Sequence, residues 1–274
     1  MTLLRPVAEI IFRAFAHLRY LLRFLWSSKH PLPGKLIVSL TSYPPRFSTL
    51  HLTLKTLLAQ SVSPDVVILW LYQGDLEKLT PEVKALTSDK FEIRTVEKDI
   101  KSYKKLVPAL QLFPEAFIVT ADDDIYYGRN WLRDLVLNYR RGVNEVVGHR
   151  AHLINFDLDN RILPYKKWQF CISFPCEGPQ VFLTTGGGVL YPPRVLPSMA
   201  NDSGKFMSLC PTNDDIWFYF MIRTNGYKYR KIMGDYIGFT WGESQGEALY
   251  HVNIAGGMND QAFQAMTDRF GSPL

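Results

Sequence analysis

Three adjacent aspartates, Asp122, Asp123 and Asp124, follow the apolar run Phe117 to Thr120. Neighbouring carboxylates repel one another, and their burial is costly unless a cation is present. Mg²⁺ and Mn²⁺ prefer oxygen ligands, and such sites commonly combine one or two carboxylates with substrate phosphates and water. Because residues two apart in an extended segment point the same way, we expect Asp122 and Asp124 to share a metal while Asp123 turns aside. The alternative is a solvated turn, which the buried-strand pattern before the triplet disfavours.

A second acidic pair, Asp214 and Asp215, opens the apolar stretch "DDIWFYFMI". A carboxylate within hydrogen-bond reach of a hydroxyl can act as a general base. Asn213 or Asp214 also suits the N-cap of the helix that this stretch predicts, because short polar side chains accept from the first backbone amides. The pair therefore has either a catalytic or a capping interpretation.

Three glycines precede another apolar stretch, "VLYPP". Glycine lets the backbone approach a ligand closely or adopt a positive φ. The run fits neither a Walker A loop nor a dinucleotide-binding fingerprint, because no helix with the required lysine or spacing follows. We expect close approach to a ligand or, alternatively, a tight turn. These residues are Gly186, Gly187 and Gly188.

Alternating strands and helices must position these groups. Apolar runs of strand length occupy residues 35–43, 65–72, 91–97 and 116–124, and helical patterns occupy 46–61, 80–89, 102–113 and 130–141. This alternation predicts an α/β fold with a doubly wound, mostly parallel sheet. Ligands bind such sheets at the carboxyl ends of the strands, which is where the aspartate triplet falls.

The remaining sequence is less repetitive, and its loops suit an acceptor-binding half. A chain of 274 residues is long enough for one large domain, and its 47% hydrophobic and 21% charged residues are those of a globular protein. The three cysteines are odd in number and lack zinc spacing. They indicate a reducing compartment rather than a disulfide scaffold.

The N-terminal segment is apolar but interrupted by arginines, so it contains no run long enough to span a bilayer. It also lacks the pattern of a secretory signal. On a helix, Arg5, Glu9, Arg13, His17, Arg19 and Arg23 share one face, and bulky apolar residues cover the other. This pattern predicts an interfacial helix that binds an anionic membrane through residues 1–26. The alternative is a helix packed on its own domain or on a partner subunit. Residues 1–30 would form this helix and a linker, before a catalytic domain at 35–274.

The strand that ends in "ADDD" resembles the DxD motif of GT-A glycosyltransferases. "SLTSYPPR" after the first strand, "DIKSYKKLVPAL" before the triplet and "CPTNDDIW" later resemble a bacterial, family 2-like group of that superfamily, which serves capsule or lipopolysaccharide synthesis. The resemblance covers residues 35 to 240. It implies a GT-A fold with a Rossmann-like nucleotide-sugar-binding half at 35–144 and an acceptor-binding half at 145–274.

The resemblance implies a metal-dependent glycosyltransferase of the hexosyltransferase type. Its donor would be a nucleotide-diphosphate sugar, with a UDP-sugar as the leading candidate, and its acceptor a hydroxyl of a cell-surface glycan or lipid-linked glycan. Mn²⁺ or Mg²⁺ would bridge the donor phosphates, with Asp124 and Asp122 as ligands. Some members complete the metal shell with a C-terminal histidine, a role for which His251 is the candidate. Asp123 would then face the ribose or the sugar.

In the resembling enzymes, the segment after the first strand lies where the nucleoside binds. Thr41, Ser42 and Tyr43 are the candidates for that contact. Arg46 is expected to meet a phosphate with its planar fork of donors, or alternatively to be a surface or helix-terminal charge.

Three further charged residues follow the third strand. Asp99 is expected to accept from uracil or ribose, and Lys104 or Lys105 to neutralise the diphosphate. A solvated run of charges is the alternative interpretation. By the same resemblance, Gly187 and Gly188 would line the sugar and acceptor pocket.

In inverting members of the resembling family, an acid in the region of "CPTNDDIW" deprotonates the acceptor hydroxyl. Asp215 is therefore the leading candidate for the base, and Asp214 is the second. A base at Asp215 suggests inversion, whereas a metal site completed by His251 suggests retention, and both outcomes stay open.

The expected location is the cytoplasmic face of the cell membrane, with no nucleic-acid partner. A non-catalytic, membrane-tethered sugar-binding or scaffold protein is the main alternative. A nucleotidyltransferase would need a glycine-rich basic loop after the first strand, which "SLTSYPPR" lacks. An aspartyl-phosphate hydrolase would need an aspartate directly after that strand, and none is present there.

Overall fold

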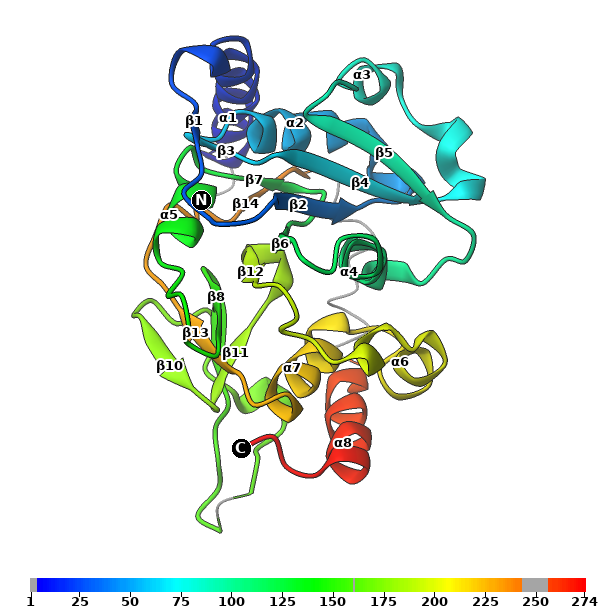
Figure 1. Cartoon of the computed structure of the whole chain (residues 1–274), viewed down its shortest axis with the longest axis vertical. Coiled ribbons are helices and arrows are strands. Elements are labelled where there is room, and N and C mark those ends of the chain that lie inside the picture. The colour runs from blue at the N-terminus through cyan, green and yellow to red at the C-terminus, as the bar shows by residue number, and fades with distance from the viewer. Residues whose placement is uncertain (1–3, 160, 243–255) are drawn as a thin grey trace.

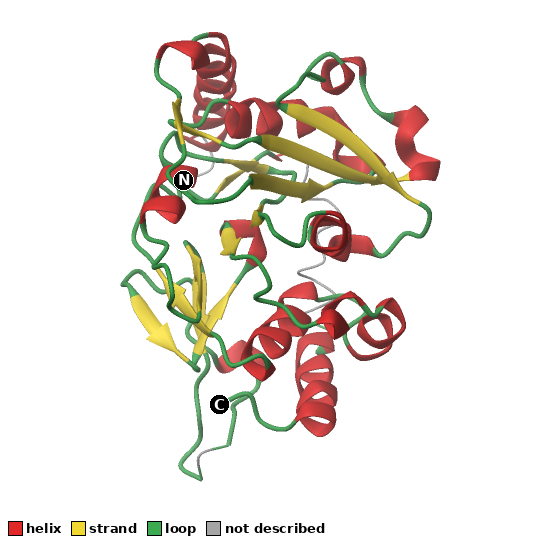
Figure 2. Ribbon diagram, viewed as in Figure 1, coloured by secondary structure: helices red, strands yellow, loops and turns green. Residues whose placement is uncertain are grey.

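The computed structural model describes residues 4–159, 161–242 and 256–274 (Figures 1 and 2). Eight strands form the central sheet, in the spatial order β10 (Cys176–Gly178), β13 (Lys228–Lys231), β8 (Glu145–Gly148), β12 (Val189–Tyr191), β6 (Phe117–Thr120), β2 (Leu36–Thr41), β4 (Val66–Tyr72) and β5 (Phe91–Val96). Only β10 and β12 run against the other strands. The predicted α/β fold with a mostly parallel sheet is confirmed.

The two faces of the sheet carry separate hydrophobic cores, because successive side chains of a strand point to opposite faces. Ile37 and Ile118 contribute to one core, and Val38 and Val119 contribute to the other. The first core is covered by α4 (Val107–Leu112), α6 (Ser203–Leu209), α7 (Asp214–Thr224) and α8 (Met258–Phe270), and the second by α2 (Phe47–Leu58), α3 (Pro81–Lys84) and α5 (Trp131–Leu137). Helices on both faces make the sheet doubly wound.

The register of the parallel pair β2–β6 positions the aspartate triplet. Ser39 lies opposite Thr120, and the Ala121 amide donates to the Ser39 carbonyl at 3.0 Å. Parallel neighbours end at the same edge, so the segments after Thr41 and after Thr120 emerge side by side. Each then turns, the first through the 3₁₀ turn η2 (Pro44–Arg46) and the second into the short strand β7 (Ile125–Tyr126).

Short strands outside the central sheet form three pairs: β1 (Ser28–Lys29) with β3 (Val62–Ser63), β7 with β14 (Phe239–Thr240), and β9 (Ala151–Leu153) with β11 (Val181–Leu183). Strand β1 lies within the predicted linker. His30, next to it, bonds Asp65 at 3.0 Å and is buried. The segment between the N-terminal helix and the sheet is therefore structured. The predicted second half also adds β8, β10, β12 and β13 to the same sheet as the first half.

Helix α1 (Leu4–Leu21) packs on α2 (Figure 1), and the side that faces the domain includes Arg19. Ala16 and Arg19 are buried there, and the Arg19 guanidinium donates to the Tyr126 hydroxyl and to the carbonyls of Tyr127 and Ala59 at 2.9–3.1 Å. The opposite side turns large apolar side chains outward, and η1 (Arg23–Leu25) extends that surface. No described helix is long and apolar enough to cross a membrane.

Candidate active site

Lys105 joins the two acidic clusters that the sequence singled out. It ends the 3₁₀ turn η4 (Lys101–Lys105), and its ammonium group lies 2.8 Å from Asp122 Oδ1, 3.4 Å from Asp214 Oδ2 and 2.9 Å from Thr185 Oγ1. The residue is 5% exposed. Burial alone would lower its pKa, but the charges of Asp122, Asp214 and Asp215 raise it, so Lys105 is held as a cation.

Asp122 is correspondingly held as an anion. Burial opposes its ionisation, but the charge and hydrogen bond of Lys105, with the charges of Arg46 and Arg150, lower its pKa. The rest of the triplet has a different partner. Arg46 Nη1 lies 2.7 Å from Asp123 Oδ1 and 3.0 Å from Asp124 Oδ2, and the Ser42 hydroxyl donates to Asp123 Oδ2 at 2.6 Å.

The structure pairs the three acids differently from the prediction, which placed Asp122 and Asp124 on the same side of an extended segment. Asp123 does not turn aside, because it shares Arg46 with Asp124, whereas Asp122 faces Lys105. The physical reason is the end of the strand: β6 stops at Thr120, so the acids lie in a turn where the two-residue period of extended backbone no longer holds.

The second acidic pair starts α7 but does not cap it. The cap is Asn213, whose side-chain oxygen accepts from the Ile216 amide at 3.2 Å. Asp215 Oδ1 instead accepts from the amide and the hydroxyl of Thr185, at 2.9 Å and 2.6 Å. Burial first, and then the neighbouring charge of Asp214, raise the pKa of Asp215 to about 6, against the opposing effect of Lys105. This carboxylate therefore takes and releases a proton near neutral pH.

The glycine run closes the space beside the triplet. A Cβ atom on Gly186 would lie 2.0 Å from Asp122 Oδ2, and one on Gly187 would lie 2.4 Å from the Arg150 side chain. Gly188 has φ +102 and lies against Trp131. The close approach that the sequence predicted is thus made to an acidic side chain of the site itself, and the turn at Gly188 requires a positive φ as well.

Three residues of the site were missed or given no role by sequence reasoning. The Tyr127 hydroxyl accepts from the Asp122 amide at 2.7 Å and donates to the Gly186 carbonyl at 2.8 Å, which ties the two loops together. Thr185 orients Asp215. Arg150 Nε donates to Cys171 Sγ at 3.4 Å, and its charge acts on both Asp122 and Asp215. In the sequence, Tyr127 and Thr185 were marked only by their closeness to "ADDD" and "GGG", and Arg150 only by its place between two histidines in "GHRAH".

Several other predicted residues lie apart from this cluster. Thr41 Oγ1 donates to the Trp70 carbonyl at 2.8 Å, and Asp99 is paired with Lys104. Lys104 is therefore engaged away from the triplet, and of the two lysines only Lys105 reaches it. Tyr43, in contrast, lies beside Arg46 of the cluster, with 5.5 Å between its ring centre and the guanidinium carbon. His251 lies outside the described residues, so its predicted metal role stays a prediction.

The described part of the site fits a divalent cation in ligand type and charge. Five carboxylates, from Asp122, Asp123, Asp124, Asp214 and Asp215, face three cations, Arg46, Lys105 and Arg150. Full ionisation would leave two negative charges without a counter-charge, and all the acidic ligands are hard oxygens. Within the described ranges no three His, Cys, Asp or Glu side chains converge on one point, so the described residues would supply no more than a pair of carboxylates to the ion.

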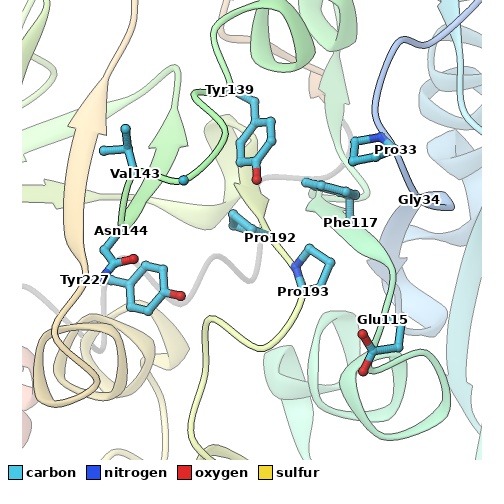
Figure 3. Close-up of a pocket in the computed structure, with 11 residues that line it drawn as sticks. Pro33, Gly34, Glu115, Phe117, Tyr139, Val143, Asn144, Pro192, Pro193 and Tyr227 are labelled. Carbon is cyan, nitrogen blue, oxygen red and sulfur yellow. The ribbon is translucent and has the colours of Figure 1, made fainter.

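A pocket of about 350 Å³ lies at the opposite edge of the sheet (Figure 3). It is lined near the amino ends of β2, β6 and β8, and the labelled side chains include Pro33, Phe117, Tyr139 and Tyr227. Its one carboxylate, Glu115, pairs with Arg194. This pocket does not contain the acidic cluster, which lies at the carboxyl edge of the strands.

Comparison with known proteins finds no matching protein-family model and no matching curated protein. Among solved structures, the chain is similar to 4-diphosphocytidyl-2C-methyl-D-erythritol synthase from Anaerococcus prevotii DSM 20548, with 12% identity over 81% of this chain and 94% of that one and a TM-score of 0.47. GalNAc-T7 with UDP, GalNAc and Mn²⁺ gives 11% identity over 86% and 56%, with a TM-score of 0.47. HddC from Yersinia pseudotuberculosis gives 10% identity over 59% and 78%, with a TM-score of 0.38. Similarity at this level shows nothing about activity.

Proposed function

We propose that this protein is a GT-A-type, metal-dependent glycosyltransferase that moves a sugar from a nucleotide-diphosphate donor, most simply a UDP-sugar, to a hydroxyl. The observation that carries the proposal is the contact of Lys105 with both Asp122 and Asp214 at the carboxyl edge of the sheet. It brings the loop of the aspartate triplet and the acidic pair at the start of α7 into one site. Ligands of doubly wound sheets bind at this edge.

Asp215 is the proposed general base. With a pKa of about 6, it is ionised at neutral pH and accepts the proton of the acceptor hydroxyl. The acceptor oxygen then bonds to the anomeric carbon of the sugar, and the bond from that carbon to the phosphate oxygen breaks. The electron pair leaves with the nucleoside diphosphate. Thr185 holds Asp215 by Oδ1, and the other carboxylate oxygen is proposed to take the proton.

The phosphate side of the site is assigned to the triplet and its cations. Asp124, with Asp123 or Asp122, would hold Mn²⁺ or Mg²⁺, and the ion when bound neutralises the developing charge of the leaving diphosphate. Lys105 fixes Asp122 in place. Arg150 has no ion pair within 4.0 Å in the described part of the chain, and its guanidinium suits a phosphate oxygen. The segment at Ser42 and Tyr43 is proposed to meet the nucleoside.

We further propose that α1 and η1 place the enzyme on an anionic membrane, which would present a lipid-linked acceptor. Half of the large, exposed apolar side chains of the described residues lie in this short segment: Val7, Ile10, Ile11, Phe15, Leu18, Leu21, Leu22, Phe24 and Leu25. Residues 1–30 carry five Lys or Arg and one Glu, which accounts for most of the net charge of +5. Of these cations, Arg19 is buried and Arg13 pairs with Glu9 at 2.7 Å, whereas Arg5, Arg23 and Lys29 are at least partly exposed. An apolar surface in a cationic segment matches the interface of an anionic bilayer. The corresponding location is the inner face of the cell membrane.

The direct test is a screen of nucleotide-sugar hydrolysis with added Mn²⁺ or Mg²⁺, which needs no acceptor. We expect one donor to be hydrolysed only with metal, and Asp124→Ala to abolish turnover. Asp215→Asn should reduce transfer once an acceptor is known, because no group remains to take the proton. Absence of hydrolysis and of metal-dependent UDP binding across the donor panel would instead support a non-catalytic scaffold.

A further inference from the structure

Arg46 holds two buried acids of the triplet together. Its Nη1 atom contacts one oxygen of Asp123 and one of Asp124, at 2.7 Å and 3.0 Å, and these side chains are only 6% and 9% exposed. Adjacent buried carboxylates are strongly unfavourable without a positive charge. The guanidinium nitrogen therefore occupies the position from which one cation can reach both acids.

The pose of Arg46 leaves part of its hydrogen-bonding capacity unused. Its Nε atom is buried and has no hydrogen-bond partner among the described residues. A guanidinium has five donors in a planar fork, and an unpaired buried donor is unfavourable. An anion with two oxygens, such as a phosphate, would satisfy more of this fork than the present contacts do.

The backbone around Arg46 is restrained while its side chain is long. Pro44 and Pro45 precede it in η2, and the turn leads directly into α2. Asp123 is restrained independently, because the Ser42 hydroxyl donates to its other oxygen, Oδ2, at 2.6 Å. Withdrawal of Arg46 would therefore leave Asp123 oriented and ready for another cation.

On this basis, and on the function proposed above, we propose that Arg46 is an exchangeable counter-ion: it neutralises Asp123 and Asp124 in the ligand-free protein, gives way to a divalent cation there, and then binds a phosphate of the donor. The acids are in this way never buried without a positive charge. Cation and diphosphate binding become coupled, and each increases the affinity for the other by the same factor. Without Arg46, no other cation of the described residues lies within 4.0 Å of Asp123, so the divalent cation loses a competitor there.

The test measures Mn²⁺ affinity directly, by electron paramagnetic resonance of free Mn²⁺, without nucleotide. We expect Arg46→Gln to bind Mn²⁺ about tenfold more tightly than the wild type, and Arg46→Lys to fall between them because a lysine offers no planar fork. Mn²⁺ should also raise the melting temperature of Arg46→Gln more than that of the wild type. This second readout requires no catalytic activity.

Arg150→Gln is the matched control, because it removes the same charge from the same site, whereas Arg46 is the residue that forms the ion pairs with Asp123 and Asp124. If the Arg46 guanidinium competes with Mn²⁺ for the two acids, Mn²⁺ affinity should rise clearly more in Arg46→Gln than in Arg150→Gln. Equal gains, an unchanged affinity in Arg46→Gln, or no Mn²⁺ binding to any variant would overturn the exchange. UDP binding by the wild type is measured in parallel, with Mn²⁺ and with chelator. If the wild type binds UDP but the two arginine variants do not differ in Mn²⁺ affinity, the exchange alone is refuted. If the wild type binds no UDP under either condition, the proposed function is refuted.

Discussion

Lys105 Nζ lies 2.8 Å from Asp122 Oδ1, and from the same position it reaches Asp214 at 3.4 Å. Asp122 follows strand β6, whereas Asp214 begins a helix on one face of the sheet. One buried ammonium group thus connects the acids on the proposed phosphate side with the pair that contains the proposed base.

Replacement of Lys105 by Met should damage both stability and turnover. It leaves Asp122 and Asp214 without their shared cation, and loss of one partner of a buried ion pair costs about 3 kcal/mol. Donor hydrolysis should fall about 100-fold because the acids are no longer positioned. Lys104→Met is a suitable comparison, since Lys104 is equally buried but pairs with Asp99. Chemical denaturation and steady-state kinetics check this prediction; equal losses of turnover in the two variants would contradict it.

The pH dependence of transfer should report Asp215. Its pKa of about 6 is raised by burial and by Asp214, and Lys105 lowers it. A base works only when ionised, so kcat/KM should fall as the pH drops below about 6. Asp214→Asn removes the like charge and should move this acidic limb to lower pH. The measurement is a profile of kcat/KM from pH 5 to pH 8. If the acidic limb does not move in Asp214→Asn, Asp215 is not the group that causes it.

Gly186→Ala should disturb the site through Asp122. The new Cβ atom would lie 2.0 Å from Asp122 Oδ2, so the carboxylate must leave its position beside Lys105. We expect a loss of about 2 kcal/mol in stability and a marked drop in donor turnover. In Gly204→Ala, the nearest atom to the added Cβ is 3.4 Å away, so this variant should keep both properties. Comparable behaviour of the two variants in melting and hydrolysis assays would argue against the packing role of Gly186.

The apolar surface of α1 should govern vesicle binding without affecting folding. Leu18 and Leu21 are 51% and 70% exposed, and Leu112 and Leu137, elsewhere on the surface, are 56% and 63% exposed. Replacement of Leu18 and Leu21 by Ser should weaken binding to anionic vesicles at least about tenfold, because two apolar side chains no longer enter the interface. The double replacement of Leu112 and Leu137 should leave it unchanged. Co-sedimentation with anionic vesicles measures this binding. Equal binding by both double variants would exclude α1 as the membrane contact.

The strands and the doubly wound sheet could be predicted because each rests on a local pattern. Continuous apolar runs such as "DVVILWLY" match strand β4, and the helical spacing of leucines in residues 46–61 matches α2. The carboxyl-edge position of the triplet followed from this alternation alone. The orientation of α1 did not follow, because amphipathicity identifies two faces but not which of them meets the domain. Burial of Arg19 depends on carbonyls of Ala59 and Tyr127 that are distant in sequence.

The sequence by itself determined the α/β alternation, the acid-rich strand end and the cationic, apolar N-terminal helix, since these depend on residues close together in the chain. Only the tertiary structure decided how the charges pair. Lys105 rather than Lys104 reaches Asp122, Arg46 joins Asp123 to Asp124, and Asn213 takes the cap and leaves Asp215 to Thr185. The reason is physical: a charged side chain takes whichever opposite charge the folded chain brings within a few ångströms, and sequence spacing does not contain that distance.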